Sequence, residues 1–208
     1  CLRFGIVPLA NQQPFSREEA AAYTQQLLAL GTAHGIDRIG VAPATTMQRA
    51  RETLHARKSL GLHDTMQFTY RNPDRSTNPQ VSVPNAQAMI VGACSYATDA
   101  PPAPLQLSAR VARYAWANYY ESLREGLGVV SDALRADGWN AQVFVDHNAL
   151  VDRESAYLAG LGWYGKNANL LINGAGSFFV LGSVVTDAPL VVNERPADDG
   201  CGACKRCL

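Results

Sequence analysis

The sequence lacks the features that would mark a membrane protein, a secreted disulfide framework or a free-standing nucleic-acid binder. No apolar run in its 208 residues approaches the roughly 18 residues of a transmembrane helix, and its start shows no signal-peptide pattern. Its 18 Lys and Arg are balanced by 18 Asp and Glu, whereas a nucleic-acid-binding domain is usually basic. Only 17% of the residues are charged, against about 25% in soluble domains. That shortage leaves two explanations open, an alanine-rich composition or a surface covered by another molecule or by further chain.

The composition that is present indicates a globular fold. Hydrophobic residues make up 47% of the chain and aromatic residues 8%, which excludes a disordered or collagen-like protein. A chain of this length forms about one to two domains and buries roughly 70% of its unfolded surface. A sizeable core is therefore expected.

Three of the five cysteines form the strongest local motif. Cys201, Cys204 and Cys207 follow the spacing C-x2-C-x2-C, which opens the ligand run of bacterial ferredoxins. The odd number of cysteines argues against a disulfide framework and favours metal binding in a reducing compartment. A structural zinc site usually has two separated cysteine pairs, although zinc and unliganded thiols stay open as alternatives. Because the chain stops inside this motif, we expect it to be a piece of a longer protein.

Periodicity predicts alternating helices and strands in the first half of the chain. The capping box of Ser16 and Glu19 begins a helix that ends near Gly35. A short strand is expected over 36–42, followed by a second helix that Thr45 or Thr46 caps and that runs to about residue 60. The Pro-, Asn- and Ser-containing segment 62–86 reads as a long loop, and loops of that length tend to be functional or mobile.

The second half continues the same pattern and predicts a mixed α/β core. The continuous apolar run at 89–94 reads as a buried strand. The remaining expected elements are a loop at 99–104, a helix at 119–137, a strand at 141–145, a helix at 150–161 and two strands at 170–172 and 178–186 joined by the turn 173–176.

An acidic residue ends one of these strands. Asp146 follows Val143-Phe-Val145, and Arg153 lies seven residues further on, about two helical turns away. Sites of open α/β sheets lie at the carboxyl ends of strands, so Asp146 and Arg153 could share a pocket. Asp146 could instead cap a helix that starts near residue 149.

Two further segments combine aromatic, glycine and basic residues. Gly160-Leu-Gly-Trp-Tyr-Gly-Lys166 lacks the spacing of an ATP phosphate loop. It indicates either close approach to a flat or bulky ligand or a glycine-rich turn with Trp163 in the core. Ala112-Arg-Tyr-Ala-Trp116, followed by two tyrosines, suits either stacking on a planar ring or half-buried packing.

Taken in order, the motifs resemble those of one family. The chain resembles epoxyqueuosine reductases in six motifs. They are Val-Ala-Arg113-Tyr-Ala, Val-Phe-Val-Asp146, Gly-Leu-Gly-Trp-Tyr-Gly-Lys166-Asn, Gly-Ser177-Phe-Phe-Val-Leu-Gly, Thr-Asp187-Ala-Pro-Leu and the cysteine motif. The resemblance is close over residues 85–208 and looser over 17–84.

The resemblance implies a fold, a reaction and its cofactors. It implies a nitroreductase-like, corrinoid-reductase-like cobalamin domain over 1–196, including the loop 62–86, and the start of a ferredoxin-type domain over 197–208. The family reduces epoxyqueuosine in tRNA to queuosine, the last step in the biosynthesis of that base, with cobalamin and two [4Fe-4S] clusters. A cytoplasmic monomer is expected, with an electron donor such as reduced flavodoxin or ferredoxin and a tRNA gripped partly by further C-terminal chain.

The resemblance also implies roles for individual residues. Asp146 corresponds to the proton donor, which protonates the oxygen as the epoxide opens. Because a free Asp has a pKa near 3.9, donation at neutral pH needs burial or an acidic neighbour. Arg153 is expected to position the cofactor or substrate. The implied cofactor contacts are Arg71 (or Arg75), Arg113, Tyr114, Arg153, Lys166, Asn167, Asn169 and Ser177, and the implied cluster ligands are Cys201, Cys204 and Cys207.

Two other functions stay open at this point. One is an iron–sulfur electron-transfer module without epoxide chemistry, and the other is a corrinoid-dependent reductase that acts on a small molecule. The zero net charge weighs against tRNA, because phosphate contacts need Lys and Arg. That objection weakens if the basic surface lies elsewhere in a longer protein.

Overall fold

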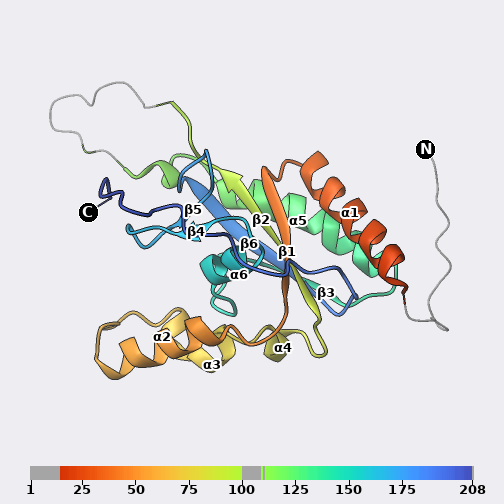
Figure 1. Ribbon diagram of the computed structural model, residues 1–208, viewed down its shortest axis with the longest axis horizontal. Helices are drawn as coiled ribbons and strands as arrows, with labels where there is room; N and C mark the ends of the chain where they lie inside the picture. Colours follow the sequence, from red (N-terminus) through yellow and green to blue (C-terminus); the bar gives the residue numbers. More distant parts are fainter. Residues whose placement is uncertain (1–14, 100–108, 110, 208) are drawn as a thin grey trace.

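A four-stranded antiparallel sheet forms the centre of the molecule (Figure 1). The computed structural model describes residues 15–99, 109 and 111–207. The strands lie in the order β1-β2-β6-β3 and each pairs antiparallel with its neighbour. Their bounds are β1 (Arg38–Pro43), β2 (Ala88–Ser95), β3 (Ala141–Val145) and β6 (Phe179–Thr186). Helices cover both faces, so the mixed α/β class expected from the sequence is confirmed.

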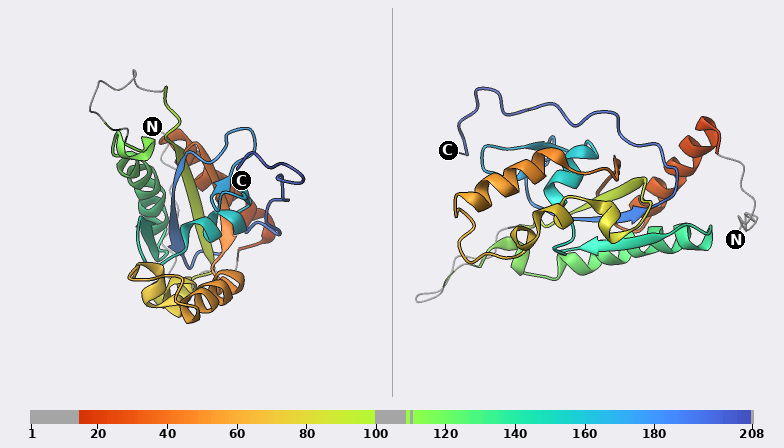
Figure 2. Two further views of the ribbon diagram at one scale, coloured as in Figure 1. Left: turned by 90° about the vertical axis from the view of Figure 1, so that its left-hand side faces the viewer. Right: turned by 90° about the horizontal axis from the view of Figure 1, so that it is seen from below.

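Two long helices, α1 (Arg17–Ala33) and α5 (Tyr119–Ala136), cover one face of the sheet (Figure 2). The predicted capping box is present, because the Glu19 backbone N–H donates to Ser16 Oγ at 3.2 Å and the Ser16 N–H donates to Glu19 Oε2 at 2.8 Å. The predicted apolar stripe of α5 is fully buried against the sheet and consists of Leu123, Leu127, Val130 and Leu134.

Two paired glycines let α5 approach the sheet closely. Gly92 of β2 lies opposite Gly182 of β6. A Cβ atom at Gly92 would lie 3.2 Å from Leu127, and one at Gly182 would lie 2.7 Å from Val145. The apolar run at 89–94 is thus a buried strand, as predicted, and its glycine is a packing requirement.

The shorter helices α6 (Asp152–Leu158) and α2 (Gln48–Ser59) belong to the other side of the sheet. Two expectations fail here. Helix α6 is shorter than 150–161, because the residues before it form a turn that packs Ala149 and Leu150 into the core. Helix α2 has Met47 as its N-cap, without a side-chain cap, so Thr45 or Thr46 does not cap it. Burial of Met47, which is 1% exposed, determines where this helix begins.

The segment 62–86 is more ordered than the loop expected. It contains the 3-10 turn η1 (Thr69–Arg71) and the single-turn helices α3 (Pro73–Ser76) and α4 (Pro79–Ser82). Two Asn-Pro pairs explain the helices. Asn72 Oδ1 accepts from the Arg75 N–H at 3.1 Å and Asn78 Oδ1 from the Gln80 N–H at 3.2 Å, while proline suits the first helical position.

The two strands expected at 170–172 and 178–186 and the turn between them are present, but they belong to different sheets. β5 (Leu170–Leu171) pairs with β4 (Trp163–Tyr164) in a separate two-stranded sheet and not with β6. A bridge between Ile172 and Gly176 closes the turn before β6. The 3-10 turn η2 (Arg113–Ala115) precedes α5. The loop expected at 99–104 lies outside the described residues except for Asp99.

The segment after β6 returns across the molecule to β4 (Figures 1 and 2). The Asn193 N–H donates to the carbonyl of Val41 in β1 at 2.8 Å, and Gly200 packs against the ring of Trp163. None of the helices within 15–99, 109 and 111–207 has the length and apolar character needed to cross a membrane.

Candidate active site

A cavity of about 1140 Å3 opens where the central sheet ends. β2 and β3 end at this edge and β6 begins there. Ligand pockets usually measure about 300–1,000 Å3, so this one suits a ligand larger than a drug-sized molecule. Its lining comes from α2, the segment 62–70, the start of α6 and the turn before β6, together with Tyr96, Tyr114, Tyr120, Asp146, Tyr164 and Asn169.

Asp146 lines this cavity from the loop that follows β3. It is exposed and has a φ of 52°, a left-handed conformation that Asp tolerates better than most residues. The alternative reading of Asp146 as a helix cap is wrong, because α6 begins at Asp152 with Val151 as its N-cap. Asp146 reaches the cavity through an antiparallel sheet, and not through the parallel arrangement on which the sequence argument relied.

A second acid, Asp152, lines the same cavity and was missed by the sequence analysis. Its Oδ1 atom is inaccessible to solvent and has no hydrogen-bond partner among the described residues. Burial, and then the charge of Asp146, raises the pKa of Asp152 to about 8, while Arg153 opposes the shift. The sequence signal that could have pointed to Asp152 is its position next to Arg153 and six residues after Asp146.

Arg153 holds the loop between β4 and β5. Its Nη1 donates to the carbonyl of Ala168 at 3.3 Å, and it forms no ion pair with a carboxylate in the part of the chain that the structure describes. Ala168 has a φ of 61°. The next residue, Asn169, donates its N–H to Asn167 Oδ1 at 3.1 Å. Arg153 and Asn169 both line the cavity, whereas Asn167 does not.

Lys166 faces the cysteine segment instead of the cavity. Its Nζ donates to the carbonyls of Gly202 at 2.9 Å and Cys204 at 2.7 Å. Trp163, which belongs to the same glycine-rich segment 160–166 as Lys166, donates its Nε1–H to Cys201 Sγ at 3.4 Å. The glycine-rich segment therefore tethers the C-terminal chain.

The aromatic residues expected near the cofactor gather around Tyr96 at one end of the cavity. The ring centroid of Tyr96 lies 6.5 Å from Tyr114, 5.9 Å from Tyr119 and 5.6 Å from Phe178. Tyr114 lines the cavity, and Ser177 does so from the turn before β6. Arg113 lies outside the lining, with its guanidinium 5.3 Å from the Phe178 ring.

The two arginines near residue 73 lie beside the cavity and not in its lining. Arg71 belongs to η1, whose Thr69 and Tyr70 do line it. Arg75 Nη2 donates to Asn148 Oδ1 at 3.2 Å, which ties α3 to the loop that carries Asp146.

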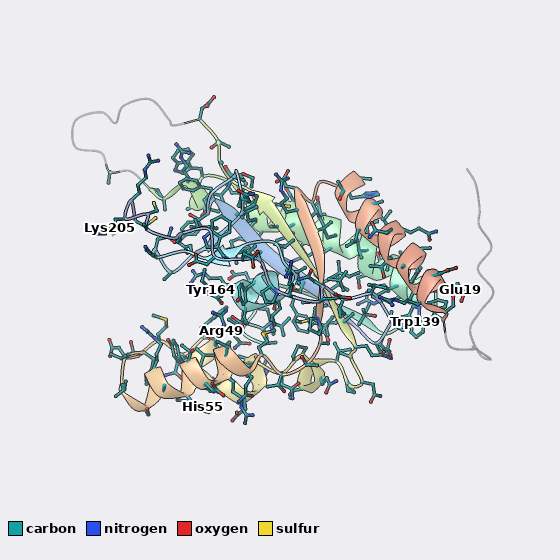
Figure 3. All side chains as sticks on the ribbon, viewed as in Figure 1. Glu19, Arg49, His55, Trp139, Tyr164 and Lys205 are labelled. Carbon is teal, nitrogen blue, oxygen red and sulfur yellow. The ribbon has the colours of Figure 1, made fainter. Side chains whose placement is uncertain are left out.

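A buried ion pair crosses the back of the cavity. Glu154, whose side chain is 3% exposed, accepts two hydrogen bonds from Arg49 of α2 and one from the Tyr164 hydroxyl at 2.9 Å. The Arg49 guanidinium lies 4.4 Å from the ring centroids of both Tyr157 and Tyr164. Figure 3 shows Arg49 and Tyr164 facing each other between α2 and β4. The pair fixes α2 to α6.

The predicted cluster ligands are not gathered into a metal site. Cys204 and Cys207 are exposed and Cys201 is partly exposed. Within the described ranges, no group of three or more His, Cys, Asp or Glu side chains has the arrangement of a metal site. Cys201, Cys204 and Cys207 thus stay a predicted ligand set.

Comparisons with known proteins point to one family. Residues 76–147 match the family model described as epoxyqueuosine reductase QueG, DUF1730. The chain is 30% identical over 193 residues to an epoxyqueuosine reductase of Bacillus cereus, covering 88% of this chain and 50% of that protein. The chain is therefore similar to epoxyqueuosine reductases over most of its own length. It spans about half the length of the curated relatives that it matches.

Solved structures agree with this similarity. A crystal structure of epoxyqueuosine reductase with an epoxyqueuosine-modified tRNA-Tyr stem loop superposes with a TM-score of 0.79 at 27% identity, covering 88% of this chain and 50% of that one. A reductive dehalogenase, whose structure suggests a mechanism for B12-dependent dehalogenation, has a TM-score of 0.56 at 16% identity, covering 93% of this chain and 22% of that one. That second likeness extends to the fold alone.

Proposed function

We propose that this chain forms the cobalamin-binding and substrate-binding part of an enzyme that reduces epoxyqueuosine in tRNA to queuosine. The observation that carries the proposal is the cavity of about 1140 Å3, which combines the carboxyl groups of Asp146, Asp152 and Glu154 with an aromatic wall, in a chain similar to epoxyqueuosine reductases. The domain bounds 1–196 and 197–208 belong to the same proposal.

The cavity suits a large ring cofactor. Tyr96, Tyr114 and Tyr120 provide aromatic surface within the lining, and planar aromatic side chains stack on flat ring systems. Asn169 and Ser177 offer polar contacts for the amide-bearing edge of a corrin. Bound cobalamin would supply the electrons that open the epoxide. Arg71, Arg113, Lys166 and Asn167 lie outside the lining, so contacts from them are the less supported part of the expectation.

Asp146 is proposed to protonate the epoxide oxygen. As a C–O bond of an epoxide breaks, negative charge develops on oxygen, and a positioned acid stabilises that charge by donating a proton. Arg153, held by the carbonyl of Ala168, is proposed to orient the loop of Asn169 against the cofactor. The sequence analysis called for burial or an acidic neighbour, and Asp152 lines the same cavity.

The segment 48–76, which contributes to the lining of the cavity, is more basic than the chain as a whole. Residues 48–76 contain six Lys or Arg and three Asp or Glu, a net charge of +3 in a chain of zero net charge. Several of these basic residues lie on α2, whose Arg57 also lines the cavity. Phosphate contacts come from Lys and Arg, so α2 supports tRNA as the substrate despite the neutral total.

Anaerobic titration of the chain with cob(II)alamin, followed by visible and EPR spectra, tests the cofactor. We expect saturable conversion to a base-off spectrum, equal in wild type and in the control variant Asp132→Asn, which alters an exposed residue of α5. Asp146→Asn should keep this binding and abolish reduction of an epoxyqueuosine-containing tRNA stem loop. Arg153→Ala should lose affinity or turnover. A folded chain that leaves the spectrum unchanged would remove the cobalamin proposal.

Iron and sulfide analysis after anaerobic reconstitution tests the cysteine segment. The predicted [4Fe-4S] cluster requires iron that is retained by the wild type and lost in Cys201→Ser. Equal iron in both proteins would show that this segment is not the ligand set. The donor and the monomeric state stay predictions, which turnover with reduced flavodoxin or ferredoxin and sedimentation analysis would check.

A further inference from the structure

The cavity contains a carboxyl group to which the proposed reaction gives no role. Asp152 is the first residue of α6 and lines the same cavity as Asp146. Its Oδ1 atom is shielded from solvent and makes no hydrogen bond to any described residue. Buried polar atoms are nearly always paired, because an unpaired one is destabilising. An unpaired carboxyl oxygen at a cavity wall therefore indicates a functional group.

The groups around Asp152 come from three elements. Asp146 faces it from the loop after β3, Arg153 follows it on α6, and Tyr120 faces both acids from α5. Burial and the charge of Asp146 favour the protonated carboxyl, Arg153 favours the ionised one, and the pKa is raised to about 8. The pKa of Tyr120 is also raised, first by burial and then by the two acids, so Tyr120 keeps its proton as well.

The proposed reaction consumes two protons. When an epoxide becomes an alkene, both C–O bonds break, a carbon–carbon π bond forms and the oxygen leaves as water. Two electrons come from the reductant, here a low-potential electron donor acting through the bound corrinoid. One proton goes to the oxygen as the first C–O bond opens, and a second goes to the same oxygen as water departs. A single carboxyl group carries one proton at a time.

We propose that Asp152 is the proton reserve of this cavity: it holds one proton at neutral pH and passes it to the Asp146 carboxylate, which delivers it to the substrate oxygen, and Asp152 is reprotonated from water before the second proton is needed. This role rests on the proposed function. Both protons then reach the oxygen through Asp146, and Asp152 acts without touching the substrate. Transfer through a single water molecule is within the reach of general acid–base chemistry. Oδ1 of Asp152 is shielded from solvent, and Asp146 lines the same cavity.

Infrared spectroscopy of the intact chain tests the proton itself, without substrate or cofactor. The carbonyl stretch of a protonated carboxyl is followed in D2O as the pH rises from the ordinary Asp pKa, about 3.9, to well above 8. We expect a signal that survives at neutral pH in wild type and in Asp132→Asn. It should be absent from Asp152→Asn and persist in Asp146→Asn with a lower midpoint, because the charge of Asp146 is gone.

The pH profile of tRNA reduction tests the relay. Wild-type turnover should fall as Asp152 ionises, and Asp152→Asn should slow turnover by about tenfold or more, a typical scale for an acid–base group. Asp152→Glu should restore part of the rate, which loss of folding could not explain. A neutral-pH carboxyl signal unaffected by Asp152→Asn would overturn the proposal. So would the expected titration combined with unchanged turnover in Asp152→Asn. A wild type that titrates as expected but reduces no epoxide would overturn the proposed function, and with it the relay.

Discussion

The ion pair between Arg49 and Glu154 should be a main support of the cavity, and a neighbouring arginine provides its control. We consider Arg49→Met, which keeps an apolar stem of similar length and removes the guanidinium. Glu154 is almost fully buried, at 3% exposure, whereas Arg49 is 51% exposed. Two positions along the same helix, Arg51 pairs with Asp74 at 2.7 Å, but both partners are largely exposed. The two variants therefore differ in the burial of the acid left unpaired.

The size of the effect follows from that burial. Removing one partner of a buried ion pair typically costs about 3–5 kcal/mol, because an uncompensated charge remains in a low dielectric. Loss of two guanidinium–ring contacts adds roughly 0.5–1 kcal/mol each, whereas the solvent exposure of Arg49 reduces the Coulombic part. We expect Arg49→Met to lower the free energy of unfolding by about 3 kcal/mol. Arg51→Met should fall near the error of the measurement.

Urea unfolding at neutral pH, monitored by tryptophan fluorescence, measures both variants against wild type. A third variant, Glu154→Gln, removes the charge but keeps a hydrogen-bonding side chain beside Tyr164. Combining it with Arg49→Met should recover part of the lost stability, because no unpaired charge is left. If Arg49→Met were no more destabilising than Arg51→Met, the buried pair would not be what holds α2 to α6. The same result would remove the structural reason for the shape of the cavity.

Three further outcomes are expected. Asp152→Asn should be more stable than wild type, and the difference in the free energy of unfolding should grow by about 1.4 kcal/mol per pH unit between about pH 4 and about pH 8. In wild type the unfolded carboxyl ionises over this range, while the folded one, with its pKa raised to about 8, keeps its proton. Urea unfolding measures this difference, and a difference that does not change with pH would show that the carboxyl is not buried. Lys166→Met removes two hydrogen bonds to the cysteine segment and should speed alkylation of Cys201 severalfold, and an unchanged rate would show that Lys166 is not a tether. Gly182→Ala should destabilise by about 1–3 kcal/mol through overpacking against Val145 of β3 and Leu127 of α5, and a thermal midpoint equal to that of wild type would refute the close packing at this glycine.

The amino-acid sequence by itself determined the local structure and the resemblance to epoxyqueuosine reductases. The capping box, the apolar stripe of α5 and the continuous apolar run of β2 each encode an element through neighbouring residues, so their positions were predicted correctly. The motifs that resemble those of epoxyqueuosine reductases could be recognised for the same reason, because short patterns such as Val-Phe-Val-Asp146 consist of neighbouring residues. The start of α2 could not be predicted from neighbouring residues, because it depends on the burial of Met47 in the core.

The tertiary structure alone decided which side chains meet. Strand order and the antiparallel pairing of β6 with both β2 and β3 bring Asp146 and Asp152 to one cavity, and no spacing rule contains that information. The same folding turned Lys166 toward the cysteine segment and away from the expected cofactor contacts. The sequence analysis did not single out Asp152, because nothing in its neighbouring residues shows that its carboxyl group is buried. A pKa depends on surroundings that come from distant parts of the chain, and for that physical reason its proton could be assigned only from the fold.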